Sequence, residues 1–293
     1  MKHFIPFLFA IIMVSCNSPK ENKIDYGSNS AVGKYAEVNG IKVYYEIYGE
    51  GEPLLLLHGN GGSIESFIYQ IPELAKHFKV IAVDSRAQGR TTDADQEISY
   101  ALMASDMAGL IDKLNLGKVN VVGWSDGGNI GLEMAYAYPE KVLKVVACGA
   151  NYTHENFIAP PDSAVMDKDD PLVKKTSELL KRSTTSIQRL SPDTLRIPLI
   201  KKKLGDLMEK YPNFTPAQLK TIKVPFLIIA GDHDLINLNH TISLFTSLPK
   251  AELFIVPHAT HVVLIENPEL INSEVIRFLK TPYTDIDRYY FAK

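Results

Sequence analysis

The sequence predicts an α/β fold: a doubly wound, mostly parallel sheet with an inserted helical cap. Three observations indicate it. Short apolar runs of strand length recur along the chain, and segments with helical spacing of apolar residues separate them. Between residues 151 and 220 the alternation stops, and no strand pattern occurs there. Strands that alternate with helices form right-handed crossovers around a parallel sheet.

Five of the expected parallel strands are continuous apolar runs, as suits a sheet that helices cover on both faces, and the sixth, at 251–259, is more broken. They are PLLLLHG (53–59), KVIAVDSR (79–86), KVNVVGWS (118–125), VLKVVACGA (142–150), VPFLIIAGDHD (224–234) and AELFIVPHA (251–259). Before them, YAEVNGIKVYYEIYGEGEP alternates between apolar and polar residues. Asn39 and Gly40 in that stretch predict the turn of a β-hairpin.

Three segments show the apolar stripe of a helix. The stripes are Phe67, Ile71, Leu74 and Phe78; Leu102, Met103, Met107, Leu110 and Leu114; and Ile271, Val275 and Phe278, after a start at Asn267 and Pro268. Residues 151–220 are charged and proline-dotted, with amphipathic patches such as LVKKTSELLKR. We therefore expect a core of residues 34–150 and 221–282, with a helical cap at 151–220 over the strand ends.

The N-terminus predicts export. Lys2 precedes an apolar run from Phe4 to Val14, which is shorter than the roughly 20 residues that span a bilayer but fits a secretory signal. The ending MVSC resembles a bacterial lipobox, so we expect a signal peptide at 1–15 and a lipid on Cys16. This would anchor the chain in a membrane on the periplasmic or outer side of a bacterial envelope. A plain signal peptide or an uncleaved anchor is the alternative.

Residues 16–33 are polar and predict a flexible tether. The formal net charge of −3 argues against nucleic acid as a partner, because phosphate binding needs a clustered basic excess. Cys16 and Cys148 are the two cysteines. Since Cys148 lies in an expected buried strand, no disulfide is expected.

The motif GWSDG, residues 123–127, predicts a nucleophile. An apolar strand enters it and a helical segment leaves it, which is the context of a G-x-S-x-G elbow. The sharp turn would expose the Ser125 hydroxyl at the carboxyl edge of the sheet. Gly123 and Gly127 would let strand and helix approach closely. The amides that follow Ser125 lie at a helix N-terminus, which favours an oxyanion.

A serine nucleophile needs a base and an acid that orients the base. Two later strands end in GDHD and in HATHVV, on the same sheet edge as the serine. The candidates for the acid are Asp232 and Asp234, and those for the base are His258 and His261.

Four motifs together resemble the α/β-hydrolase family over residues 35–280. They are HGNGGS (58–63), DSRAQGRT (84–91), GWSDGG (123–128), and GDHD (231–234) with HVVLIENP (261–268). The resemblance implies the α/β-hydrolase fold and a catalytic triad of Ser125, Asp234 and His261, with Glu266 starting the last helix.

The resemblance also assigns an oxyanion hole to the backbone amides of Asn60 and Asp126. It makes His58 a structural residue of the loop. Asp84 and Arg86 are expected to be structural too, while Ala87 and Gln88 stand where the family usually has glycine and histidine.

The function so implied is that of a serine hydrolase that cleaves a small ester, thioester or amide through an acyl-enzyme. Alternatives are a carbon–carbon bond or lactone hydrolase on the same triad, or a hydrolase-like ligand-binding protein. The elbow resembles that of valacyclovir hydrolase-like esterases, which implies that Trp124 and Asp126 contact substrate and that Asp126 faces an ammonium group. The alternative is that Asp126 caps the following helix.

No cofactor is expected. A G-x-G-x-x-G fingerprint follows none of the expected strands, and the spacing of His258 and His261 in a loop does not favour a metal site.

Overall fold

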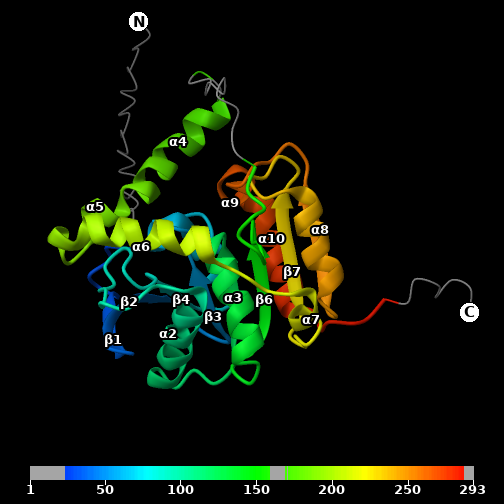
Figure 1. Cartoon of the computed structure of the whole chain (residues 1–293), viewed down its shortest axis with the longest axis horizontal. Coiled ribbons are helices and arrows are strands. Elements are labelled where there is room, and N and C mark those ends of the chain that lie inside the picture. The colour runs from blue at the N-terminus through cyan, green and yellow to red at the C-terminus, as the bar shows by residue number, and fades with distance from the viewer. Residues whose placement is uncertain (1–23, 159–168, 170, 287–293) are drawn as a thin grey trace, which may run out of the picture.

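The computed structural model describes residues 24–158, 169 and 171–286. Its centre is an eight-stranded sheet in the order β1-β2-β4-β3-β5-β6-β7-β8 (Figure 1). The strands are β1 (Lys34–Val38), β2 (Ile41–Tyr48), β3 (Pro53–Leu57), β4 (Lys79–Val83), β5 (Val119–Trp124), β6 (Val142–Cys148), β7 (Phe226–Gly231) and β8 (Ala251–Val256). Strands β3 to β8 pair in parallel, which confirms the predicted mostly parallel sheet.

The first two strands form the predicted hairpin. Strands β1 and β2 pair antiparallel, with Val38 opposite Ile41. Asn39 and Gly40 connect them with φ angles of 46° and 76°, the left-handed pair that a two-residue hairpin turn requires. Strand β2 then adds antiparallel to β4 at the edge of the parallel part.

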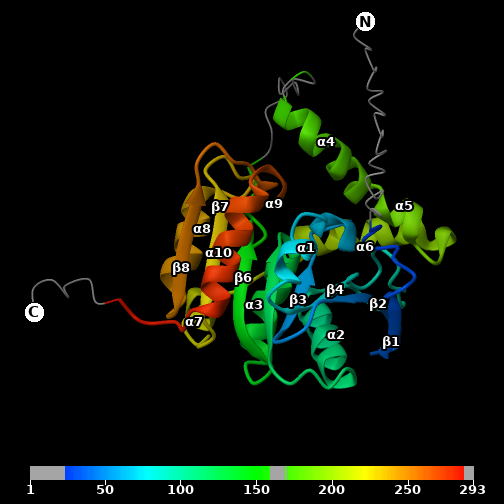
Figure 2. The same cartoon turned by 180° about the vertical axis from the view of Figure 1, so that it is seen from behind.

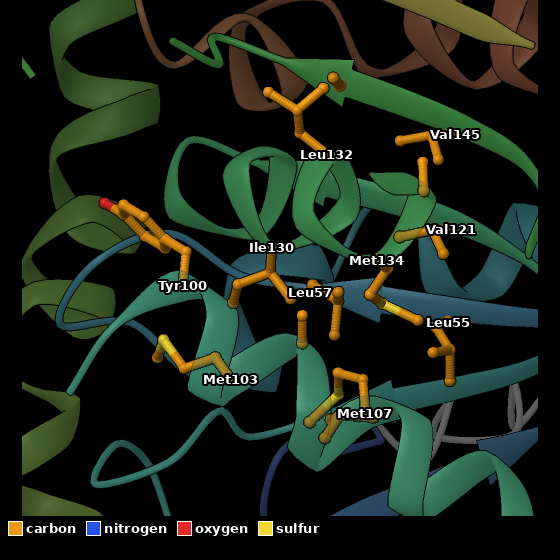
Figure 3. Close-up of a cluster of buried hydrophobic side chains, with 14 of the residues drawn as sticks. Leu55, Leu57, Tyr100, Met103, Met107, Val121, Ile130, Leu132, Met134 and Val145 are labelled. Atoms are coloured by element: carbon orange, nitrogen blue, oxygen red, sulfur yellow. The ribbon is translucent and has the colours of Figure 1, made fainter. Parts of the chain in front are cut away.

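Helices cover both faces of the sheet, as Figures 1 and 2 show from opposite sides. One face packs against α2 (Tyr100–Lys113), α3 (Asp126–Ala137) and α8 (Leu238–Ser247). The other face packs against α1 (Ile71–Leu74), α9 (Val263–Glu266) and α10 (Pro268–Lys280). Figure 3 shows the first of these cores, where Leu55 and Leu57 of β3 meet the methionines of α2 and Ile130 of α3. The buried apolar side chains on both faces stabilise the layered arrangement.

The helix expected from Phe67 to Phe78 is broken in two. The 3-10 helix η1 (Ile64–Phe67) ends before α1 begins. Pro72 has no backbone N–H to donate to Ile68, so one continuous helix cannot form across this point. All four residues of the predicted stripe are nevertheless buried.

Helix α10 begins at Pro268, as predicted, and buries the expected stripe. Asn267 occupies the N-cap position but makes no side-chain cap hydrogen bond. Glu266 ends the short helix α9 and does not start α10.

Between β6 and β7 the described residues form helices, of which α5 and α6 lie across one end of the sheet, α4 projects away from it, and α7 lies toward the opposite end, near the start of β7 (Figure 1). They are α4 (Pro171–Thr184), α5 (Ser186–Leu190), η2 (Thr194–Arg196), α6 (Ile197–Lys210) and α7 (Pro216–Leu219). An ion-pair cluster attaches α4 and α5 to the core. Glu65 of η1 is fully buried and accepts from Arg182, at 2.9 Å, and from Arg189.

The second half of the predicted tether is part of the folded domain. The carboxylate of Glu46, which is fully buried, accepts hydrogen bonds from the amides of Gly27 at 2.8 Å and Asn29 at 2.9 Å. The side chain of Arg90 binds the Gly27 carbonyl, and Asp25 pairs with Arg182 of α4. Composition alone does not predict these contacts, because all the partners lie far away in the sequence.

Cys16 and the apolar run before it lie outside the described residues. Among residues 24–158, 169 and 171–286, no helix is long and apolar enough to cross a membrane.

Candidate active site

Ser125 lies on a strained turn between β5 and α3. Its φ of 53° and ψ of −117° are unusual for a residue with a side chain, and such a conformation costs about 1–3 kcal/mol. The surrounding fold holds it there. The Ser125 amide donates to the Cys148 carbonyl of β6 at 2.8 Å, and the Ser125 carbonyl accepts from Gly128 at 2.8 Å. The serine therefore stands at the carboxyl end of β5, as the motif predicts.

Two glycines make this turn possible through close backbone approach. A Cβ atom on Gly127 would lie 1.8 Å from the carbonyl oxygen of Leu57, and one on Gly123 would lie 2.1 Å from that of Gly127. Neither distance is compatible with a side chain. The glycines thus allow α3 to start directly against β3 and β5.

The structure pairs one acid with one base among the four candidates. Asp234, after β7, and His261, after β8, are joined by a 2.7 Å contact between Oδ1 and Nδ1. The Asp234 side chain is only 1% exposed. Its Oδ1 also accepts from the Ile236 amide at 2.9 Å, which fixes its orientation.

The rival residues lie together elsewhere. Asp232 contacts His233 at 2.7 Å, and the ring of His258 stacks on His233 with a centroid distance of 6.4 Å. The geometry therefore brings together the acid and base that the family resemblance implies.

Sequence reasoning missed three features of the surroundings of His261. Trp124 donates its indole N–H to the His261 carbonyl at 2.8 Å. Glu266 accepts from the amide and hydroxyl of Thr260, at 2.8 and 2.7 Å. Gly149, with φ of 59°, leaves room for the imidazole, since a Cβ atom there would lie 2.9 Å from it. Trp124 was predicted to contact substrate, and its observed partner is the backbone of the base.

The predicted oxyanion donors flank the serine. Gly59 lies so near it that a Cβ atom on this glycine would be 3.2 Å from the Ser125 Cβ. No acceptor among the described residues receives a hydrogen bond from the amide of Asn60 or of Asp126. Both amides are thus available to a ligand at the elbow, although their catalytic role is still a prediction.

His58 holds the start of this loop. Its Nδ1 binds the Gly59 carbonyl at 2.8 Å, and its Nε2 accepts from the Ser85 amide at 3.0 Å. Complete burial lowers the pKa of His58 to about 4, so the ring is neutral at pH 7. A neutral ring has one donor and one acceptor nitrogen, as these two contacts require.

Gln88, one of the departures from the family pattern, also binds this loop. Its Oε1 accepts from the Gly61 amide at 2.6 Å, while Ser186 of α5 donates to the Gly61 carbonyl at 2.8 Å. Ala87, the other departure, has a positive φ of 65°, which explains why glycine suits this position. The motif DSRAQGRT marks Gln88 as unusual in the sequence, but the motif does not indicate that Gln88 binds the Gly61 amide.

Asp84 and Arg86 have the structural roles expected of them. The buried Asp84 carboxylate accepts from the Ile64 and Arg90 amides, at 2.8 and 2.7 Å. Burial raises the pKa of Asp84 to about 7. Arg86 forms a fully buried bidentate pair with Asp106.

The carboxylate of Asp126 makes two tertiary hydrogen bonds. Its Oδ1 accepts from the Tyr100 hydroxyl at 2.7 Å, and its Oδ2 accepts from the Asn60 side-chain amide at 2.9 Å. Asp126 is the first residue of α3, and the N-cap, Ser125, has no side-chain cap bond. Burial raises the pKa of Asp126, against the opposing effect of these two donors.

Comparison with known proteins agrees with this fold. Residues 52–178 match the model of the alpha/beta hydrolase fold. The chain is a hydrolase with the α/β-hydrolase fold. The chain is 25% identical to the 2-hydroxy-6-oxo-6-(2'-aminophenyl)hexa-2,4-dienoic acid hydrolase of Metapseudomonas resinovorans, over 89% of this chain and 95% of that protein.

Solved structures share its fold. Est816, an N-acyl homoserine lactone degrading enzyme, superposes with a TM-score of 0.69 at 23% identity, over 84% of this chain and all of that one (100%). The enol-lactonase of Burkholderia xenovorans LB400 gives a TM-score of 0.65 at 23% identity, over 85% of this chain and 100% of that one. At this level of identity, the likeness establishes the fold of this chain and leaves its substrate open.

Proposed function

We propose that this α/β-hydrolase cleaves a small ester, thioester or amide through an acyl-enzyme on Ser125. The observation that carries the proposal is the strained elbow at Ser125 on the same sheet edge as the buried Asp234–His261 pair. A serine that is only held in place for packing would not need this conformation. The nearby unpaired amides supply the electrostatic part of the same chemistry.

In the proposed reaction Ser125 Oγ attacks the acyl carbonyl while His261 takes its proton. Asp234 holds His261 Nδ1–H and stabilises the imidazolium. The carbonyl oxygen becomes an oxyanion that the Asn60 and Asp126 amides bind. His261 then protonates the leaving group, and the same base activates the water that hydrolyses the acyl-enzyme.

Labelling by a fluorophosphonate probe tests this function. The wild type is expected to be labelled at Ser125, because the probe reacts with an activated serine. Ser125→Ala should not be labelled, and its ester turnover should fall to background. An unlabelled but folded wild type would contradict the proposal and favour the ligand-binding alternative.

A second candidate is hydrolysis of a lactone on the same triad. Two of the structures described above carry lactone-degrading activity in their names, and the proposed acyl-enzyme chemistry applies equally to a cyclic ester. A panel of short-chain esters, aminoacyl esters and lactones, compared by kcat/KM, separates the two candidates.

We also propose that the chain is exported and carries a lipid on Cys16. The supporting observation is the apolar run followed by MVSC. Because the bonded segment starts near Ile24, eight peptide links separate it from Cys16, which span at most about 29 Å. The α/β-hydrolase would then act close to the membrane surface. Mass spectrometry of the mature N-terminus should find a lipidated Cys16, whereas a chain that starts at Met1 would refute export.

A further inference from the structure

We propose that Asp126 is a positioning residue that sets the oxyanion hole by holding the side chain of Asn60. This inference rests on the proposed serine hydrolase function. It assigns Asp126 a role in transition-state stabilisation for every substrate, in place of the selection of cationic ones. The observation is the 2.9 Å hydrogen bond from Asn60 Nδ2 to Asp126 Oδ2.

The bond joins the two residues that present the candidate oxyanion donors. Asp126 contributes its own amide at the start of α3, and its carboxylate holds the residue that contributes the other amide. Without this side-chain contact, the loop around Asn60 could shift and turn the backbone N–H of Asn60 away from the oxyanion while leaving the Ser125 elbow unchanged. The relative position of the two donors therefore depends on this contact. Oxyanion stabilisation is sensitive to such displacements, because the donors must be aimed before the charge develops.

A second contact extends the arrangement to the cap. Asn60 Nδ2 also lies 3.4 Å from the carbonyl oxygen of Leu204 in α6, whose side chain is 2% exposed. The Asn60 amide group is thus held between the elbow and the cap. The local motif HGNGGS does not indicate these two contacts of Asn60, because both partners come from distant parts of the chain.

The anchor at the far side of the carboxylate is rigid. Tyr100 begins α2, and its ring is 2% exposed at the edge of the apolar core. Figure 3 shows its hydroxyl group at the end that points away from the other labelled side chains. That hydroxyl donates to Asp126 at 2.7 Å. A packed tyrosine therefore fixes the carboxylate, and the carboxylate fixes Asn60.

The chemistry of the pair explains why the residue is an aspartate. Tyr100 and Asn60 each donate one hydrogen bond, so the residue between them must accept twice. A carboxylate has two acceptor oxygens, whereas an asparagine has one oxygen and one donor nitrogen. Asp126→Asn would leave two donor groups facing each other at one contact.

The arrangement also argues against a substrate ammonium group as the main partner of Asp126. The residue is 4% exposed, and each of its oxygens already accepts from a protein donor. A residue that selects cationic substrates is expected to expose a carboxylate oxygen that has no protein hydrogen-bond donor. The two roles differ in which substrates they affect, and this difference can be measured.

The test compares wild type with Asp126→Asn on a neutral ester and on an α-amino ester of the same alcohol. We expect kcat to fall about 10- to 100-fold on both esters, with KM changed less than about threefold, since the lost interaction acts in the transition state. A thionoester gives the specific readout. Sulfur accepts hydrogen bonds poorly, so a weakened oxyanion hole should lower the oxoester-to-thionoester ratio of kcat by a similar factor.

A polarity swap provides the rescue. In the double variant Asn60→Asp with Asp126→Asn, the amide introduced at position 126 can accept from Tyr100 and donate to the carboxylate introduced at position 60. A recovery of kcat by about fivefold or more over Asp126→Asn is expected, with the thionoester ratio returning toward wild type. Asn60→Asp alone should be as impaired as Asp126→Asn, because two carboxylates would then face each other.

Asn120→Ala is the matched control. Asn120 is buried on β5 and its side-chain amide donates to Glu52, but it contacts neither the oxyanion donors nor Tyr100. The change removes a tertiary hydrogen bond and should leave the thionoester ratio unchanged. A loss confined to the α-amino ester in Asp126→Asn would overturn the inference in favour of substrate selection. An unchanged thionoester ratio in a folded Asp126→Asn would also overturn it. Absence of fluorophosphonate labelling in the wild type would instead refute the proposed function.

Discussion

Asp234→Asn is expected to lower kcat by about 10³- to 10⁴-fold without unfolding the protein. The reason lies in the 2.7 Å contact from Asp234 Oδ1 to His261 Nδ1. An asparagine amide would force the imidazole toward the wrong tautomer and could not stabilise the imidazolium. The measurement is single-turnover acylation of a chromogenic ester, with circular dichroism to verify the fold.

Asp232→Asn is the control for this experiment, since it lies two residues away and pairs with His233 instead. Its kcat should remain within about threefold of wild type, as expected for a residue that contacts no reacting group. Equal losses in the two variants would mean that the acid has been assigned wrongly or that both changes disturb the loop after β7.

Arg86→Met is expected to destabilise the fold by about 3–5 kcal/mol. Arg86 and Asp106 are both 0% exposed and form two hydrogen bonds of 2.7 Å. Removing the guanidinium leaves the carboxylate of Asp106 buried with Asn39 as its other side-chain donor. An uncompensated buried charge is more costly than the loss of the pair itself. Urea denaturation followed by fluorescence gives the free energy of unfolding.

Two further variants test this explanation. The double change Arg86→Met with Asp106→Leu should recover much of the lost stability, because it removes both charges together. Arg277→Met breaks two ion pairs, with Glu252 and Glu274, of an arginine that is 44% exposed, and its effect should stay within about 1 kcal/mol. If Arg86→Met and Arg277→Met lower the free energy of unfolding by the same amount, the buried Arg86–Asp106 pair does not stabilise the fold as its burial indicates.

The strands and turns that depend on a local sequence pattern were predictable from the sequence. Each expected parallel strand occurs. The five continuous apolar runs lie inside the sheet, where helices cover both faces, and the more broken sixth run forms the edge strand β8. The hairpin turn at Asn39 and Gly40 follows from backbone preferences alone. The helix expected across Pro72 failed, since the apolar stripe alone does not reveal a missing hydrogen bond.

The site was predictable only where a motif carried it. Ser125, Asp234 and His261 were named in advance, and the structure joins the last two and keeps their rivals apart. The contacts of Gln88 and Glu266 were not foreseen, although both residues stand in recognised motifs. A motif indicates the residue types that a site needs, but the partner of each side chain comes from another part of the chain.

By itself, the sequence determined the order of strands and helices and the position of the nucleophile, because both depend on neighbouring residues and on backbone preferences. Only the tertiary structure decided that residues 24–33 belong to the domain, through the buried carboxylate of Glu46. The tertiary structure likewise decided the partners of Asp126, for which the sequence allowed either a helix cap or a contact with substrate. The carboxylate bonds Tyr100 and Asn60, and these residues approach it only after the sheet and α2 have packed. The physical reason is that hydrogen bonds between distant residues form according to three-dimensional proximity, which a linear pattern does not encode.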